Sequence, residues 1–73
     1  MDNLSIDNIF TYHAPFGTQI VRYKNIREKA KELALMVNSQ CPESREKALA
    51  LTNLQQAVFW MNASIAINEK ETK

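Results

Sequence analysis

Apolar side chains recur at intervals of three and four residues over two long stretches of the chain, and this spacing places them on one face of an α-helix. The first stretch contains Ile20, Tyr23, Ile26, Ala30, Leu33 and Val37. The second stretch contains Leu51, Leu54, Val58, Met61 and Ile65. Two helices whose apolar seams face each other across a short connection form an antiparallel hairpin. The sequence therefore predicts an all-α fold built on a two-helix hairpin.

Proline and glycine mark the ends of these two segments, because both residues interrupt helices. Pro15 and Gly17 precede the first helix, and we expect the hydroxyl oxygen of Thr18 to cap it by accepting a hydrogen bond from a free backbone N–H. Pro42 suits the first turn of the second helix, and Ser44 is a competing N-cap. A single domain, residues 1–73, then comprises a short N-terminal helical arm (1–17), a first helix (18–39), a second helix (42–69) and a polar tail (70–73). The end of the chain, from Glu69 onward, is expected to fray.

The second helix carries another apolar surface, which points away from the seam. This surface comprises Phe59, Trp60, Ala63 and Ile67. Large aromatic side chains left in water usually mark an interface. An alternative cover is the arm, which has apolar side chains of its own, namely Leu4, Ile6, Ile9 and Phe10. We expect the arm to cover the surface in part and another subunit to cover the rest.

The length of the chain also favours self-association. A domain of 73 residues leaves much of its surface uncovered, and small domains compensate with disulfides, a structural metal or oligomerisation. Cys41 and His13 are each the only residue of their type, so no intrachain disulfide can form, and one His with one distant Cys lacks the four clustered ligands that a structural zinc site requires. We therefore expect a homo-oligomer, with no metal site and no cofactor.

The charge balance is close to neutral, with nine Lys and Arg residues against eight Asp and Glu residues. This balance argues against a general polyanion binder that relies on bulk charge, so any anion site must be local. No apolar run approaches the length of a membrane span, and the chain has no charged and then apolar leader. We expect no membrane partner and a cytosolic location.

Catalysis is poorly supported by the residue types present. General acid–base and nucleophilic mechanisms need a nucleophile, a base and an orienting group, and one His with one Cys supply little of this. The single Gly also excludes a glycine-rich phosphate-binding loop. The sequence therefore predicts a binding protein and not an enzyme.

An aromatic segment next to a basic stripe forms the candidate ligand site. Tyr12 and His13 lie in an arm stiffened by Pro15, and such rings can stack on a planar ligand. The basic stripe, on one face of the first helix, comprises Lys24, Arg27 and Lys31. Together these groups suggest a nucleotide, although composition alone favours a packing role for Tyr12 and a solvated basic face. A nucleic-acid-binding module and a helical module that docks a protein are the rival functions.

Motifs in both halves of the chain resemble a family of small phage proteins that defeat bacterial immunity. In the first half they are Tyr12-His13-Ala14-Pro15, Gln19, Arg22-Tyr23 and Arg27. In the second half they are Cys41-Pro42-Glu43-Ser44-Arg45-Glu46, Ala48-Leu49-Ala50-Leu51, Trp60 and Asn62-Ala63-Ser64-Ile65-Ala66. The motifs span nearly the whole chain, which is therefore similar to the anti-CBASS cyclic-oligonucleotide sponges.

This resemblance implies a helical homohexamer that sequesters cyclic dinucleotides, such as cyclic GMP-AMP, in pockets between subunits and does not cleave them. Some members of the family also bind cyclic trinucleotides at separate sites. The resemblance further implies that the protein acts in the cytoplasm of the infected bacterial host, where it keeps immune effectors inactive. No nucleic-acid polymer is an expected partner.

The resemblance also assigns roles to individual positions. Tyr12 corresponds to the stacking aromatic residue, and Arg27 corresponds to the basic residue that meets the ligand phosphates. His13 and Pro15 lie in the same motif and are expected to shape the pocket wall. The second helix of the family commonly closes with Ile-Ala-Arg, whereas this chain has Asn68 where that arginine falls if the alignment continues. A polar amide cannot replace a permanent charge against phosphate, which weakens the case for trinucleotide binding.

Overall fold

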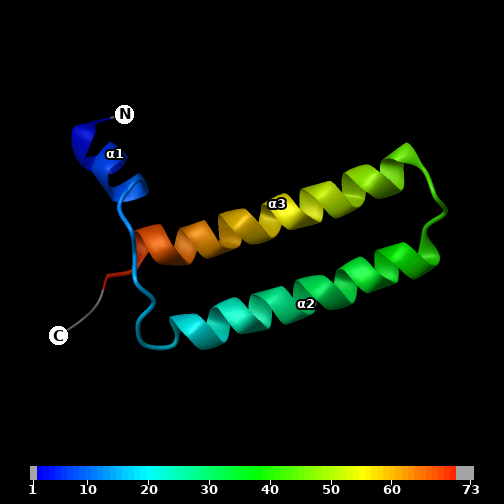
Figure 1. Cartoon of the computed structure of the whole chain (residues 1–73), viewed down its shortest axis with the longest axis horizontal. Coiled ribbons are helices and arrows are strands. Elements are labelled where there is room, and N and C mark those ends of the chain that lie inside the picture. Colours follow the sequence, from blue (N-terminus) through cyan, green and yellow to red (C-terminus); the bar gives the residue numbers. More distant parts are fainter. Residues whose placement is uncertain (1, 71–73) are drawn as a thin grey trace.

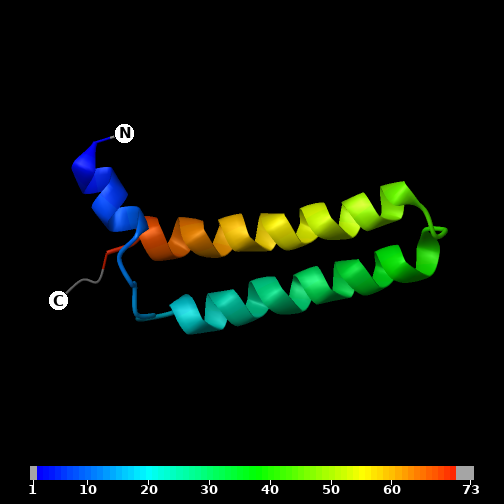
Figure 2. The same cartoon turned by 45° about the horizontal axis from the view of Figure 1, so that its top comes forward.

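The computed structural model describes residues 2–70, and within them the chain forms three helices and no strand. The helices are α1 (Asn3–Ile9), α2 (Gln19–Gln40) and α3 (Arg45–Asn68). The two long helices, α2 and α3, lie side by side and run antiparallel, and α1 lies beyond the C-terminal end of α3 (Figure 1, Figure 2). The molecule is thin, with extents of 48 × 29 × 12 Å. The prediction of an all-α fold is confirmed.

The N-terminus of α2 lies close to its predicted position but is capped differently. Gly17 has a φ of 56°, a left-handed conformation that glycine adopts without steric cost, and it turns the chain into the helix. Thr18 occupies the N-cap position, yet its side chain makes no capping hydrogen bond, so that part of the prediction is wrong. The Thr18 hydroxyl instead accepts a hydrogen bond from Nε of Arg22 at 3.1 Å.

The N-terminus of α3 is set by Ser44 and not by Pro42. The Ser44 hydroxyl accepts a hydrogen bond from the backbone N–H of Lys47 at 3.1 Å and donates one to the carbonyl of Pro42 at 3.0 Å. Because this cap satisfies a free N–H at the start of the helix, Pro42 stays in the connection. The prediction that Pro42 lies in the first turn is therefore wrong, and the competing N-cap is the one observed.

Lys47 closes the end of the hairpin at this connection, which we call the turn end. Its side chain is only 6% exposed and forms an ion pair with Glu43. Its Nζ also donates a hydrogen bond to the carbonyl oxygen of Asn38 at 3.0 Å, in the last turn of α2. A cation at this position satisfies a carbonyl that the helix leaves free and complements the negative end of its dipole.

The seam between α2 and α3 follows the predicted pattern over most of its length. Its half-buried members are Tyr23, Ile26, Ala30, Val37, Leu51, Leu54, Val58 and Ile65. Leu33 and Met61 are more open, at 46% and 47% exposed, and the largest departure is Ile20, which is 64% exposed, whereas the neighbouring Gln19 is 2% exposed. Neighbouring residues on a helix point in directions about 100° apart, so a polar contact that turns Gln19 inward necessarily turns Ile20 outward.

The described part of the single chain, residues 2–70, contains no buried apolar core. Within residues 2–70, only Gln19 and Lys47 are buried, and no hydrophobic side chain is. Phe59 and Trp60 are 60% and 74% exposed, so the arm does not cover this part of the outward surface of α3. Partial cover is observed further along, where Ile67 is half-buried and lines a pocket with residues of the arm.

None of the helices formed by the described residues combines the length and hydropathy that a membrane crossing requires. Of the predicted polar tail, residues 71–73 lie outside the described part of the chain.

Candidate ligand-binding site

The segment that carries Tyr12 leaves α1 and is attached to the C-terminal turn of α3. The side-chain amide of Asn8 donates a hydrogen bond to the carbonyl of Ile67 at 3.0 Å. The carbonyl of Asn8 lies 2.7 Å from Nε2 of His13, and because a carbonyl only accepts, His13 carries the proton on Nε2. Residues 11–16, which we call the Tyr12 segment, are thus tied to α3 at their upstream end.

A second set of contacts ties the downstream end of the Tyr12 segment to α3. The backbone N–H of Phe16 donates to Oε1 of Gln19 at 3.1 Å, and Nε2 of Gln19 donates to Oε1 of Glu69 at 3.1 Å. Arg22 donates to both carboxylate oxygens of Glu69, at 2.6 Å and 2.5 Å. We call Gln19, Arg22 and Glu69 the open-end clamp, because they join the start of α2 to the end of α3.

The charge state of the open-end clamp follows from these contacts. The two hydrogen bonds from Arg22, with a further contribution from Gln19, lower the pKa of Glu69 from 4.5 to about 2. The same carboxylate raises the pKa of Arg22 above its ordinary value. Both groups therefore remain ionised throughout the physiological pH range, since each stabilises the charged form of the other.

A pocket lies between the Tyr12 segment and the end of α3. It is lined by Asn8, Tyr12, His13, Ala14, Phe16, Ile67, Glu69 and Lys70. Tyr12 is 83% exposed, so its ring is available to a molecule outside the chain. The structure therefore brings Tyr12 and His13 together, as predicted, in a setting that combines aromatic and polar groups. Pro15 is exposed in the same segment but does not line this pocket.

The basic stripe lies elsewhere on the molecule. Arg27 and Lys31 line a groove between α2 and α3, together with Leu51, Gln55 and Phe59 among others. Arg27 is eight residues beyond Gln19, about 12 Å along the helix axis. Lys24 is exposed and lies 3.8 Å from the carboxylate of Glu28. Within one chain, then, the aromatic half and the basic half of the predicted site are separate.

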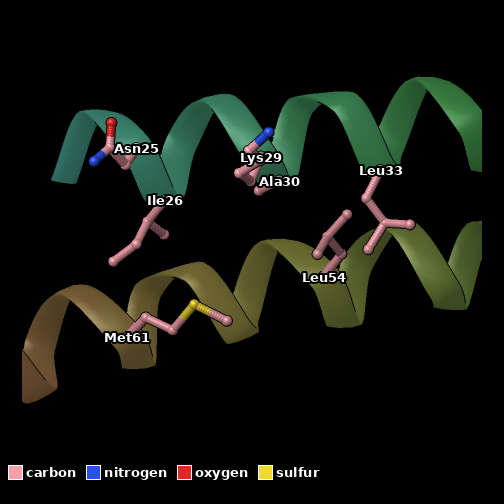
Figure 3. Close-up of a pocket in the computed structure, with 7 residues that line it drawn as sticks. All are labelled: Asn25, Ile26, Lys29, Ala30, Leu33, Leu54 and Met61. Carbon is pink, nitrogen blue, oxygen red and sulfur yellow. The ribbon is translucent and has the colours of Figure 1, made fainter. Parts of the chain in front are cut away.

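Another groove opens in the seam itself and contains none of the predicted ligand-binding residues (Figure 3). Ile26 and Leu33 point from α2 toward Leu54 and Met61 of α3, and the space between them is apolar. Within residues 2–70, no group of three or more His, Cys, Asp and Glu side chains is placed to hold a metal ion.

Sequence reasoning missed the structural role of Glu69 and of Gln19. Glu69 was expected at the start of a fraying end, yet it lies 47 residues from its partner Arg22 and is held by two hydrogen bonds. A signal was available, because an antiparallel hairpin brings the start of its first helix beside the end of its second. An Arg near one of these ends and a Glu at the other are then candidates for an ion pair.

Comparisons with curated proteins and with solved structures give no match. The family model of the Acb2/Tad1 hairpin domain, in contrast, matches residues 2–66, which include both long helices almost completely and the whole Tyr12 segment. The chain therefore belongs to the Acb2/Tad1 family of anti-CBASS cyclic-oligonucleotide sponges, binding proteins that are associated with sequestering cyclic oligonucleotides.

Proposed function

We propose that this chain binds cyclic dinucleotides, such as cyclic GMP-AMP, and sequesters them without cleavage. The observation that carries the proposal is the placement of Tyr12, an exposed aromatic ring on a segment tied to α3 at both ends, in a chain of this family. Stacking on an aromatic ring suits any base, because every base has a π-face. Tyr12 is therefore the group that receives a base of the ligand.

Arg27 is the group that meets the ligand phosphates. Its guanidinium is exposed, and neither it nor Lys31 has an ion-pair partner among residues 2–70. A guanidinium can donate two parallel hydrogen bonds to a phosphate. Lys31 and Lys24 add positive charge along the same face, and His13 and Pro15 shape the wall near the base.

The complete site is formed by two copies of the chain. A cyclic dinucleotide has two bases and two phosphates related by an approximate two-fold axis, so equivalent chains can offer each half the same contacts. The separation of Tyr12 from Arg27 within one chain supports this arrangement, because a second copy can supply the missing half. We propose a homohexamer, in which further copies cover the exposed Phe59 and Trp60.

Sequestration acts by mass action in the cytoplasm of the infected bacterium. Each occupied site removes one messenger from solution, so effectors remain inactive once the sites outnumber the messengers. No bond of the ligand is formed or broken in this mechanism.

Cyclic trinucleotides are weaker ligands in this proposal. Asn68 stands where the family commonly has an arginine, and it carries no charge. Nδ2 of its side-chain amide already donates a hydrogen bond to the carbonyl of Ser64 at 2.9 Å. A second site that depended on an arginine at this position would lose an ionic contact.

Calorimetric titration of the full chain tests the proposal. We expect tight binding of cyclic GMP-AMP, weaker binding of a cyclic trinucleotide, and an assembly mass well above that of the 8.4 kDa chain. Ligand released by denaturation should be chemically intact. Absence of heat with every cyclic dinucleotide would overturn the proposal, as would recovery of a hydrolysed product. Salt-sensitive retention of duplex DNA in place of the small ligand would favour a nucleic-acid-binding module.

A further inference from the structure

The Tyr12 segment is the part of the proposed site that lies outside the two helices of the hairpin. Between its two attachments, Tyr12 makes no hydrogen bond to any other residue of 2–70 and is 83% exposed. The position of the Tyr12 ring therefore depends on what holds the segment at each end.

The downstream attachment to α3 passes through side chains, while a backbone hydrogen bond from the N–H of Gln19 to the carbonyl of Phe16, at 3.0 Å, ties the same residue to the start of α2. Gln19 is 2% exposed, and its side-chain amide has its orientation determined on both sides, since Oε1 accepts from Phe16 and Nε2 donates to Glu69. Glu69 is in turn held by two donors of Arg22. Phe16 is thus connected to the end of α3 through a continuous row of hydrogen bonds.

Three of the five N–H donors of Arg22 are used inside the chain. Nε donates to the Thr18 hydroxyl, and both terminal nitrogens donate to Glu69. Although Arg22 is a cation near the pocket, its charge is paired with Glu69 and its orientation is set by these contacts. A group occupied in this way orients its neighbours and does not receive the ligand.

We propose that Gln19, Arg22 and Glu69 are positioning residues, which hold the Tyr12 segment in the place where its ring can receive a base. This inference rests on the proposed function, because it assigns the open-end clamp to the same ligand site. Glu69 lies just beyond the span that the family model matches, residues 2–66, and its pairing with Arg22 and Gln19 is given by the contacts of this structure.

The expected effect on affinity follows from the fraction of molecules in which the Tyr12 segment is held in place. If the ligand binds only when the Tyr12 segment is in place, the apparent dissociation constant equals the intrinsic one divided by the fraction of molecules that are ready. A variant in which about a tenth of the molecules retain the ready arrangement should therefore bind about tenfold more weakly.

The test combines Glu69→Gln with the exchanged pair Arg22→Glu and Glu69→Arg. The matched control is Glu32→Gln, which causes the same charge change and breaks an exposed ion pair with Lys29, 3.4 Å long, on a part of α2 away from the pocket. Circular dichroism and light scattering establish that each variant is helical and assembled. A second variant, Arg22→Lys, keeps the charge but loses the paired hydrogen bonds, and it should give an intermediate result.

Two measurements are made on each variant. Hydrogen exchange of the Phe16 amide in the ligand-free protein reports whether the segment is held, and titration with cyclic GMP-AMP reports affinity. For Glu69→Gln we expect faster exchange at Phe16, unchanged exchange in the middle of α3, and about tenfold weaker binding. The exchanged pair restores opposite charges at the two positions but leaves Nε2 of Gln19 without its acceptor, so it should recover neither loss, whereas Glu32→Gln should match the wild type.

The outcomes separate this inference from the function on which it rests. If the wild type binds and Glu69→Gln binds equally well, the positioning role is overturned and the proposed function stands. Faster exchange at Phe16 without a change in affinity overturns the role in the same way. If the wild type binds no cyclic dinucleotide, the proposed function itself fails.

Discussion

The two ends of the hairpin are closed by different kinds of contact. At the turn end, Lys47 contacts Asn38 and Glu43, which lie nine and four residues away along the chain. At the open end, Glu69 contacts Arg22 and Gln19, which lie 47 and 50 residues away. The turn-end contacts can form with the connection itself, whereas the open-end contacts require the two helices to be already paired. Contacts between distant residues carry the larger cost in chain entropy.

The two ends also differ in their exposure to water. The Lys47 side chain is 6% exposed, whereas those of Arg22 and Glu69 are 40% and 35% exposed. A buried ammonium that satisfies a helix carbonyl contributes mainly to stability. A half-exposed ion pair contributes less to stability and can govern the position of a nearby segment. The comparison suggests that the turn end stabilises the fold and that the open end organises the ligand site.

The largest effect is expected from a substitution that disrupts the proposed contact between copies of the chain, on which the complete ligand site depends. Trp60→Asp places a charge on the outward surface of α3, where we propose that copies of the chain meet. Because a charge buried in an interface is costly, the assembly should fall toward the mass of a single chain, and binding should be lost with it. Light scattering and calorimetry measure the two results. Thr52→Asp, at an exposed polar position of the same helix, is the control; equal assembly in both variants would contradict the assignment of Trp60.

Tyr12→Ala should affect the open end alone. Loss of stacking is worth about 1–3 kcal/mol per base, so affinity for cyclic GMP-AMP should fall by about five- to 150-fold for each base that stacks on a Tyr12 ring. Helix content and assembly mass should not change, because the ring is exposed and packs little against its own chain. Tyr12→Phe keeps the ring and should bind nearly as well as the wild type. If Tyr12→Ala binds normally in calorimetry, stacking by Tyr12 is refuted.

Lys47→Met should affect the turn end alone. The substitution keeps the length and apolar stem of the side chain but leaves the Asn38 carbonyl without its donor. A hydrogen bond that involves a charged group contributes about 1.5–3 kcal/mol. Urea unfolding at fixed protein concentration should show this loss in the free energy of unfolding. The affinity for the ligand, measured without urea, should stay the same. Lys29→Met, on the exposed surface, should cost much less; equal losses would mean that burial of Lys47 contributes nothing.

The smallest effect is expected from acid. The pKa of Glu69 is lowered from 4.5 to about 2 by the hydrogen bonds from Arg22 and Gln19. The folded state therefore favours the ionised carboxylate, so the clamp's contribution to stability is present above the ordinary pKa and is lost as the pH falls through about 2. The carboxyl carbon of Glu69, followed by NMR, should titrate near that value. In Arg22→Gln the midpoint should rise toward 4.5, and an unchanged midpoint would show that Arg22 is not the cause.

Several features of the site could be predicted from local sequence, and others could not. Tyr12 and His13 are adjacent in a short segment, so a common pocket was foreseeable. The basic stripe was also foreseeable as a stripe, because helical spacing places Arg27 and Lys31 on one face. The distance between the basic stripe and Tyr12 could not be predicted, because it depends on how the Tyr12 segment is attached to α3. The attachment uses Ile67 and Glu69, more than 50 residues beyond Tyr12 along the chain.

The amino-acid sequence by itself determined the helical class, the two long helices, their seam and the cap at Ser44. All of these depend on spacings and hydrogen bonds within a few residues, which the chain carries wherever it folds. Only the tertiary structure decided that Gln19, and not Ile20, is buried at the open end. It also decided that Glu69 is fixed by an ion pair with Arg22 and does not fray. Both outcomes depend on the register in which α2 and α3 pair, because that register determines which distant polar groups come within hydrogen-bonding distance.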